Sequence, residues 1–219
     1  MTDHRTRFLQ LALDADALRF GGFTLKSGRV SPYFFNAGRF DSGAKTLALA
    51  ACYVDAVEQA GVGFDLVFGP AYKGIPLATA FACEYARRGR DLPMAFNRKE
   101  AKDHGEGGTL IGAPLAGRRV LVVDDVITAG TAIREALAII RGAGGVPAGI
   151  VVALDRQEIA SDTDRRSAAQ AVAEEAGIPV VAVANLGDLL AFTAGNDDLV
   201  GYREPLQAYR ARYGSHVSD

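Results

Sequence analysis

Short apolar runs alternate with longer segments of helical periodicity along most of this chain. The apolar runs expected to form strands are 64–68, 92–96, 119–123, 149–154 and 179–184. Three of these runs are followed by segments whose apolar residues recur at helical spacing, namely 74–88, 131–141 and 167–176. Strands that alternate with helices pair in parallel through right-handed crossovers. The pattern therefore predicts an α/β fold with a central parallel sheet flanked by helices.

The two ends of the chain follow a different pattern. Residues 4–20 place Phe8, Leu11, Ala12 and Ala15 on one face, which predicts a helix broken by the glycines at 21–22. Strand character follows at 33–35, and Asp41-Ser42 precede a helix expected to reach residue 60. From residue 186 onward the spacing predicts one or two helices. We expect a single domain over 1–219, in which about residues 1–40 form a small N-terminal hood over the sheet.

One stretch has no clear periodicity. Residues 97–117 are rich in glycine and charge, so we expect a long irregular loop there.

Composition narrows the classes of function. The chain has 219 residues, and 24 basic against 26 acidic side chains give a net charge of −2, which disfavours a nucleic-acid partner. Apolar runs are too short to span a membrane, and the polar start at 1–5 lacks the apolar core of a signal peptide. Cys52 and Cys83 lie in apolar helical patterns and are expected to be buried thiols. These features predict a cytoplasmic protein without a membrane partner.

Ligands of parallel α/β sheets bind where the strands end. That rule selects three loops, 69–74, 124–131 and 155–158. The second loop is the most informative, because the apolar run 119–123 ends in Asp124-Asp125 and then enters a turn with threonines and a glycine. Backbone N–H groups at a helix N-terminus suit a phosphate, and adjacent acids suit sugar hydroxyls. The alternative is a strand that ends in solvated acids before an ordinary helix cap.

The stretch 119–132 resembles the binding motif for 5-phosphoribosyl 1-diphosphate (PRPP) in type I phosphoribosyltransferases. The resemblance implies that family's fold, with Asp124 and Asp125 on the ribose hydroxyls. It also implies that one run of residues wraps the 5′-phosphate: Val126, Ile127, Thr128, Ala129, Gly130, Thr131 and Ala132.

Four further segments resemble the orotate phosphoribosyltransferases of that family: 25–35, 69–74, 97–108 and 153–158. The resemblance implies further PRPP contacts from Lys26, Tyr72, Lys73, Arg98, Lys99, Lys102 and His104. It implies orotate contacts from Phe34, Phe35, Thr128 and Arg156. The implied catalytic residues are Lys99, Lys102, His104, Asp124 and Asp125, with Lys102 expected to contribute most within its loop.

The same resemblance implies the reaction and its surroundings. We expect transfer of the phosphoribosyl group of PRPP to orotate in pyrimidine biosynthesis, by a stand-alone enzyme of the bacterial type. Mg²⁺ is the implied cofactor, bound mainly through PRPP rather than by a dedicated protein site. A homodimer is implied, in which the loop 97–108 covers the neighbouring subunit's site. Two alternatives remain: a phosphoribosyltransferase of purine salvage, and a regulator that senses PRPP without catalysis.

Overall fold

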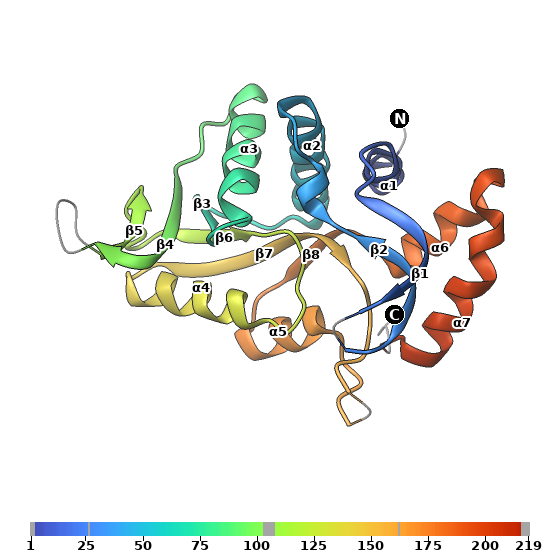
Figure 1. The fold of residues 1–219 in the computed structure, drawn as a ribbon. Coiled ribbons are helices and arrows are strands. Elements are labelled where there is room, and N and C mark those ends of the chain that lie inside the picture. Colours follow the sequence, from blue (N-terminus) through green and yellow to red (C-terminus); the bar gives the residue numbers. More distant parts are fainter. Residues whose placement is uncertain (1–2, 26, 103–107, 162, 216–219) are drawn as a thin grey trace.

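A six-stranded sheet forms the centre of the structure (Figure 1), a computed structural model that describes residues 3–25, 27–102, 108–161 and 163–215. For residues 101, 102 and 108 the description covers the backbone. The strands lie in the order β5-β4-β3-β6-β7-β8. Their bounds are β3 (Leu66–Gly69), β4 (Met94–Lys102), β5 (Gly108–Gly112), β6 (Arg119–Val123), β7 (Val146–Asp155) and β8 (Val180–Asn185). All neighbours from β4 to β8 pair in parallel, which confirms the predicted α/β fold.

Helices cover both faces of this sheet (Figure 1). One face carries α1 (His4–Asp14), α2 (Gly43–Ala60) and α3 (Gly74–Arg87), and the other carries α4 (Thr131–Gly142) and α5 (Ala168–Ala176). Beyond β8 the chain forms α6 (Leu186–Ala194), a 3-10 turn η2 (Asp197–Tyr202) and α7 (Arg203–Tyr213). The predicted start of α2 is confirmed, because the Ser42 side chain accepts a hydrogen bond from the Lys45 N–H. None of the helices in the described ranges is long and apolar enough to cross a membrane.

The central strands are apolar throughout because both of their faces are buried. In β6, Leu121 and Val123 pack into the core shared with α1, α2 and α3, whereas Val120 and Val122 pack into the core shared with α4. Side chains alternate between the two faces of a strand, so every position of such a strand must be apolar. This requirement explains why the apolar runs predicted the strands.

The expected helix over 4–20 is wrong in its second half. Helix α1 ends at Asp14, Asp16 takes a left-handed φ of 56°, and β1 (Leu18–Thr24) begins two residues later. Strand β1 pairs antiparallel with β2 (Val30–Phe35), and the pairing is irregular between Phe20 and Phe23, where the glycines lie. Residues 18–20 pair with β2 in the hairpin and do not extend the helix. Tertiary pairing therefore overrides local periodicity here.

The glycine-rich segment 97–117 also differs from the expectation. Strand β4 continues to Lys102 and pairs antiparallel with β5, with Asn97 opposite Leu110. This pair lies at the edge of the sheet, where strands need not be apolar, so periodicity did not reveal it. Of the two cysteines, Cys52 is buried as expected, but Cys83 is exposed on α3 because it lies on the solvent face.

Candidate active site

Main-chain hydrogen bonds hold the two predicted acids at the carboxyl edge of the sheet. The Asp124 N–H donates to the Val151 carbonyl at 3.0 Å, and the Ala153 N–H donates to the Asp125 carbonyl at 2.8 Å. Both partners belong to β7, whose end carries Arg156. The sheet therefore brings two of the three predicted loops next to each other.

The two carboxyl groups differ in their surroundings, although Asp124 and Asp125 are only 8% and 7% exposed. The Lys73 ammonium donates to Asp125 Oδ2 at 2.7 Å. Asp124 Oδ1 accepts a hydrogen bond from the Asp125 N–H at 2.9 Å. Burial, reinforced by the negative charge of Asp125, raises the pKa of Asp124 to about 6. From α2, the buried Tyr53 hydroxyl donates to the Asp124 carbonyl at 2.9 Å.

The turn after the acids leads directly into α4. Gly130 caps this helix with a left-handed φ of +75°, and a Cβ at Gly130 would lie 2.9 Å from Val172 Cγ2. Only glycine fits this conformation and this space without strain. Thr128 and Thr131 are exposed on either side of it. Exposed hydroxyls beside a helix N-terminus form an arrangement suited to a phosphate.

An arginine that the sequence did not single out braces this turn. Arg134 Nη1 donates to the Ala129 carbonyl at 2.8 Å. Its Nε and Nη2 donate to the two carboxylate oxygens of Glu175 on α5, at 2.7 and 3.1 Å. The turn is thereby linked to a second helix.

The loop between β3 and α3 packs closely against the acids. A Cβ at Gly74 would lie 2.8 Å from the Val123 carbonyl, so the close approach requires glycine. The Ala71 N–H donates to Asn97 Oδ1 on β4 at 3.0 Å. Tyr72 is 67% exposed, and Lys99 Nζ lies 5.0 Å from the centre of its ring. Lys99 of β4 and Tyr72 of the 70–73 loop therefore meet at this edge.

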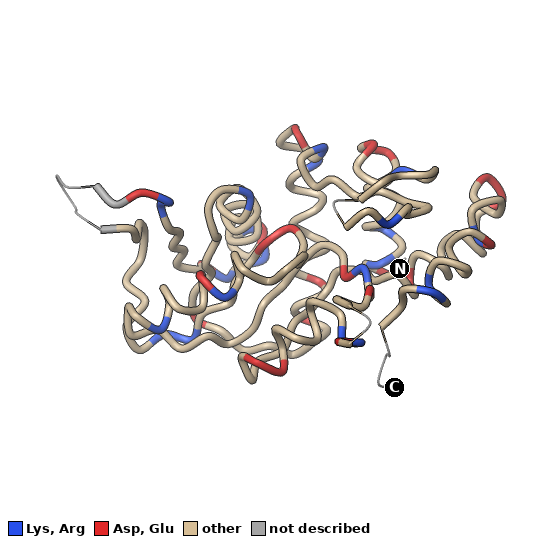
Figure 2. Tube along the Cα trace, turned by 60° about the horizontal axis from the view of Figure 1, so that its bottom comes forward, with Lys and Arg blue, Asp and Glu red and all other residues tan. Residues whose placement is uncertain are grey.

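Three of the predicted site residues are not placed by the structure. Lys26 and His104 lie outside the described residues, as does the side chain of Lys102. Arg98 is described and is half-buried in β4, directly before Lys99. Figure 2 shows basic and acidic residues interspersed along the chain, in keeping with a net charge of −2.

Arg156 joins the end of β7 to the hood. Its Nε donates to Glu158 Oε1 at 2.8 Å, and its Nη2 lies 2.6 Å from the same oxygen. Nη2 also donates to Ser31 Oγ of β2 at 3.1 Å. The guanidinium carbon lies 4.5 Å from the ring centre of Tyr33, two residues further along β2. The hood thus forms one side of the arginine's surroundings.

Phe34 and Phe35 point to opposite faces of β2. The Phe34 ring lies 5.6 Å from Phe23, whereas the Phe35 ring lies 5.9 Å from Phe8 and 6.5 Å from Phe40. Neighbouring residues of a strand alternate in this way. The two side chains therefore do not form a slot between them, and contacts from their backbone remain as the way in which both could hold one ring.

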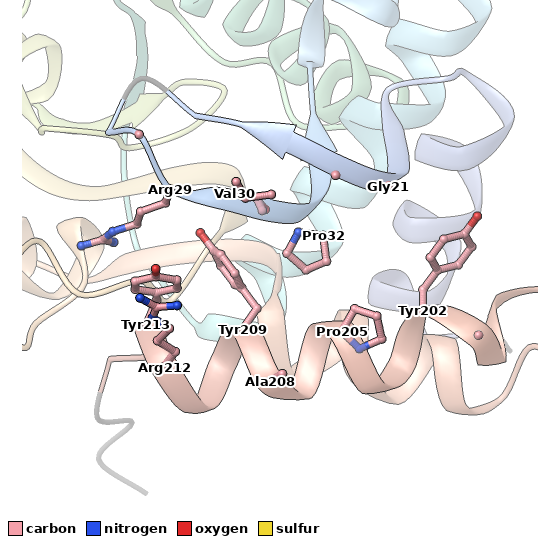
Figure 3. A pocket seen from close by; sticks show the side chains of 14 residues that line it. Gly21, Arg29, Val30, Pro32, Tyr202, Pro205, Ala208, Tyr209, Arg212 and Tyr213 are labelled. Carbon is pink, nitrogen blue, oxygen red and sulfur yellow. The ribbon is translucent and has the colours of Figure 1, made fainter.

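A pocket of about 730 Å³ lies on the other side of the hood (Figure 3). It is lined by β1, β2, the turn between them, the end of η2 and α7, and includes Ser31, Tyr209 and Tyr213. Ser31 is shared between this pocket and the surroundings of Arg156. The pocket therefore lies behind the Arg156 region rather than at the acid pair.

Several residues of the site escaped sequence reasoning: Ser31, Tyr53, Arg134, Glu158 and Glu175. Tyr53 lies on the apolar face of a helix, and Arg134 and Glu175 are typical of exposed helix positions. No signal in the sequence separates them from their neighbours, because their importance depends on which distant atoms they touch.

The acid pair offers two carboxylates that a metal ion could use. Within the described ranges, no group of three or more His, Cys, Asp or Glu side chains is arranged to hold a metal ion. Asp124 and Asp125 offer carboxylates, but one oxygen of Asp125 is bonded to Lys73. Mg²⁺ tolerates few protein ligands when a phosphate substrate and water supply the others. The two acids therefore suit a divalent cation only if its other ligands come from a phosphate and water.

Comparison with known proteins gives a consistent result. A model named phosphoribosyl transferase domain matches residues 44–172, which is more than half of the chain. The chain is 86% identical over 218 residues to an orotate phosphoribosyltransferase of Xanthomonas euvesicatoria pv. vesicatoria, with 100% of both chains covered. It is 78% identical over 214 residues to a protein of the same name from Stenotrophomonas maltophilia, with 98% of each covered.

A solved structure agrees with these relatives. The crystal structure of an orotate phosphoribosyltransferase from Francisella tularensis superposes with a TM-score of 0.86 at 41% identity. The match covers 95% of this chain and 99% of that one. The similarity therefore includes the hood and the C-terminal helices as well as the sheet.

Proposed function

The chain belongs to the orotate phosphoribosyltransferases, and we propose that it transfers the 5-phosphoribosyl group of PRPP to orotate, giving orotidine 5′-monophosphate and pyrophosphate. The observation that carries the mechanism is the buried acid pair, Asp124 and Asp125, directly before the N-terminus of α4. One end of this site suits ribose hydroxyls and the other suits a phosphate. We propose that this reaction is a step of pyrimidine biosynthesis and that it takes place in the cytoplasm.

The reaction is a displacement at the anomeric carbon of PRPP. A ring nitrogen of orotate, already deprotonated and used as its anion, forms the new bond to that carbon, and the carbon–oxygen bond to pyrophosphate breaks. Positive charge grows at the anomeric carbon while the bond to the leaving group lengthens. Asp124 and Asp125 hold the ribose hydroxyls and stabilise this charge. Fixed charges aimed at a transition state are usually the largest single contribution to catalysis.

The 5′-phosphate binds in the turn that opens α4. Backbone N–H groups from Val126 to Ala132 face it, Thr128 and Thr131 add hydroxyl donors, and Gly130 permits close approach. The support is that Gly130 has a left-handed φ and that Arg134 braces the Ala129 carbonyl, because a braced turn need not reorganise when the phosphate arrives.

Pyrophosphate leaves with concentrated negative charge, which cations must neutralise. The proposed contacts are Lys26, Tyr72, Lys73, Arg98, Lys99, Lys102 and His104. Lys73 donates to Asp125 Oδ2 at 2.7 Å, which places its ammonium group beside the proposed ribose site. Lys99, Lys102 and His104 act as catalytic groups on the loop 97–108, whose closure excludes water from the activated sugar.

Orotate lies at the hood side of the site. Arg156 binds its carboxylate through a charge-assisted hydrogen bond from its guanidinium, which is always charged. Thr128 adds a hydroxyl, and Phe34 and Phe35 contribute their backbone groups. Asp124 and Asp125 would hold a Mg²⁺ ion brought by PRPP, and such an ion would supply positive charge to the leaving pyrophosphate.

The proposed unit is a homodimer of single-domain chains, each with a hood of about residues 1–40. Each chain extends its loop 97–108 over the site of its partner. The support is that β4 and β5, which contain the two ends of segment 97–108, form the outermost hairpin of the sheet (Figure 1), where they can reach a neighbouring molecule.

The first experiment measures pyrophosphate release from PRPP with orotate, adenine or hypoxanthine, each with and without Mg²⁺. With PRPP present in every assay, turnover is expected only when both orotate and Mg²⁺ are added. Turnover of a purine base without turnover of orotate would contradict the proposal. PRPP binding without any release of pyrophosphate would favour the regulator instead.

A second experiment tests the dimer. Lys102→Ala and Asp125→Asn proteins are each assayed, then mixed under conditions of subunit exchange. If the loop acts on the partner's site, one site in the mixed dimer combines an intact acid pair with an intact loop, and activity partly returns. Two inactive proteins that stay inactive together would contradict a shared site.

A further inference from the structure

Arg156 is held from several sides, and we propose that Glu158 is the positioning residue that aims its guanidinium at the carboxylate of orotate. This inference rests on the proposed function, because it takes Arg156 as the group that receives that carboxylate. It concerns a different residue, two positions further along the chain, that touches the arginine rather than the substrate.

The hydrogen bonds of Arg156 divide its fork into two parts. Glu158 Oε1 accepts from Nε at 2.8 Å and lies 2.6 Å from Nη2, and Ser31 Oγ accepts from Nη2 at 3.1 Å. These bonds occupy the Nε and Nη2 side of the guanidinium, so among the described residues Nη1 is the nitrogen with no such bond and the one that would donate to an incoming carboxylate. The side chains of Arg156 and Glu158 are 20% and 14% exposed, so water screens their attraction little.

Tyr33 packs against the guanidinium, and Tyr209 packs against Tyr33. The ring of Tyr33 is fully buried and lies 4.5 Å from the guanidinium carbon. Tyr209 of α7 meets Tyr33 edge-on at 6.5 Å, and Figure 3 shows its ring standing between α7 and β2. With one face stacked and one edge bonded, Arg156 has lost most of its side-chain freedom before binding. Such preorganisation removes an entropic cost from substrate binding.

The backbone that presents Glu158 is itself held in a sparsely populated conformation. Gln157, between the two charged residues, has a left-handed φ of 50°. Its N–H donates to Asp155 Oδ1 at 2.9 Å, and its carbonyl accepts from the Ser215 N–H at 2.7 Å. The Ile159 N–H donates to the Tyr213 carbonyl at 2.9 Å. A non-glycine residue keeps this conformation only where its surroundings enforce it, and such residues gather at functional sites.

The closing experiment compares Glu158→Ala, Glu158→Gln and the wild type in steady-state assays with orotate and PRPP varied separately. Glu158→Ala frees the guanidinium and is expected to raise the KM for orotate about tenfold, while the KM for PRPP stays within about twofold. Glu158→Gln keeps an oxygen that accepts from Nε, so its KM for orotate is expected within about threefold of the wild type. Glu174→Ala is the matched control, since Glu174 also pairs with an arginine, Arg166, at 2.8 Å.

Two results would overturn the inference. One is a wild-type KM for orotate in Glu158→Ala, and the other is a rise in both KM values by the same factor, which indicates a general structural role. If Glu158→Ala does not fold, Glu158→Asp serves instead, because it draws the oxygens back by one methylene and should still raise the KM for orotate alone. Arg156→Ala separates the two levels. An unchanged KM for orotate in Arg156→Ala would contradict the proposed role of Arg156. If that KM rises while the KM for orotate of Glu158→Ala equals the wild-type value, only the role of Glu158 is contradicted.

Discussion

The two ends of the proposed site are built in different ways. The phosphoribosyl end comes from one continuous stretch, in which the buried strand β6 runs into the acid pair and then into α4. The base end is assembled from segments far apart in sequence: Ser31 and Tyr33 in β2, Arg156 and Glu158 after β7, and Tyr209 in α7. A continuous stretch carries its own geometry, whereas an assembled site depends on how the whole chain packs.

The two ends also differ in electrostatics. At the base end, Glu158 compensates the charge of Arg156 directly. At the phosphoribosyl end, one cation, Lys73, contacts Asp125, and burial leaves Asp124 with a pKa of about 6. The burial of the Asp124 carboxylate therefore costs folding free energy that Lys73 does not fully offset. At the base end, the ion pair with Glu158 offsets the burial of the Arg156 charge.

The largest effect is expected at Asp125. Asp125→Asn removes a fixed negative charge beside the anomeric carbon, and kcat should fall about 100-fold or more, since one such group contributes roughly 3 kcal/mol to the transition state. The measurement is steady-state turnover of orotate with PRPP. Asp41→Asn is the matched control, because Asp41 also pairs with a lysine, Lys45, at 2.8 Å. Asp41 is exposed and lies two residues before the start of α2. A wild-type kcat in Asp125→Asn would exclude the acid pair from the reaction.

The next effect is on stability and depends on pH. The pKa of Asp124 is about 6 in the folded protein against an ordinary value of 3.8, so the folded state keeps a proton that the unfolded state releases. Stability from this group is complete below about pH 4 and is lost as the pH rises through about 6. Asp124→Asn should therefore match the wild type near pH 3.5 and be more stable at pH 8, by up to about 3 kcal/mol.

Urea unfolding of both proteins across this pH range measures the difference. Other buried carboxyls are common to the two proteins and cancel. A stability gap that does not change with pH would show that the phosphoribosyl end carries no such cost.

A smaller effect is expected from the brace of the phosphate turn. Arg134→Ala removes the bond to the Ala129 carbonyl and should raise the KM for PRPP roughly threefold to tenfold, equivalent to about 1 kcal/mol, with the KM for orotate unchanged. Glu175→Ala should have part of this effect, and the double variant should add little, since both act through one link. Arg166→Ala controls for the loss of a surface arginine. Additive effects would mean that Arg134 and Glu175 act independently.

The smallest effect is expected at Tyr33, on the base end. Its hydroxyl is buried without a hydrogen-bond partner among the described residues, so Tyr33→Phe keeps the ring beneath Arg156 and loses nothing that is bonded. The KM for orotate should stay within about twofold and the melting temperature should not fall. Tyr33→Leu, which removes the aromatic face, should raise the KM for orotate. A large rise in Tyr33→Phe would assign the hydroxyl a role that the geometry does not suggest.

The sequence predicts the phosphoribosyl end of the proposed site better than the base end. The acid pair and the turn at 126–132 were predicted as one unit, and the structure finds the unit intact between β6 and α4. The roles of these residues stay predictions, as do those of Lys26, Lys102 and His104. Arg156 is predicted by the family resemblance and supported by its place after a strand, but Glu158, two residues later, is not predicted, because nothing in its spacing shows what it contacts.

Local pattern was misleading where two structures compete for the same residues. Leu18 to Phe20 continue a helical pattern from α1, yet they belong to β1, because β2 offers a partner from the other side of a turn. The same holds for β4 and β5, whose polar residues need only one neighbouring strand. In each case the outcome depends on a pairing that no window of sequence contains.

The sequence by itself determined the parallel sheet and the phosphoribosyl end of the site, because a strand buried on both faces must be apolar and a strand end, acids, glycine and helix start are neighbours along the chain. The tertiary structure alone decided the hood hairpin, the opposite orientation of Phe34 and Phe35, and the surroundings of Arg156. Those features consist of contacts between β2, β7 and α7. Such contacts are set by burial and pairing in the folded chain and leave no periodic trace in the order of residues.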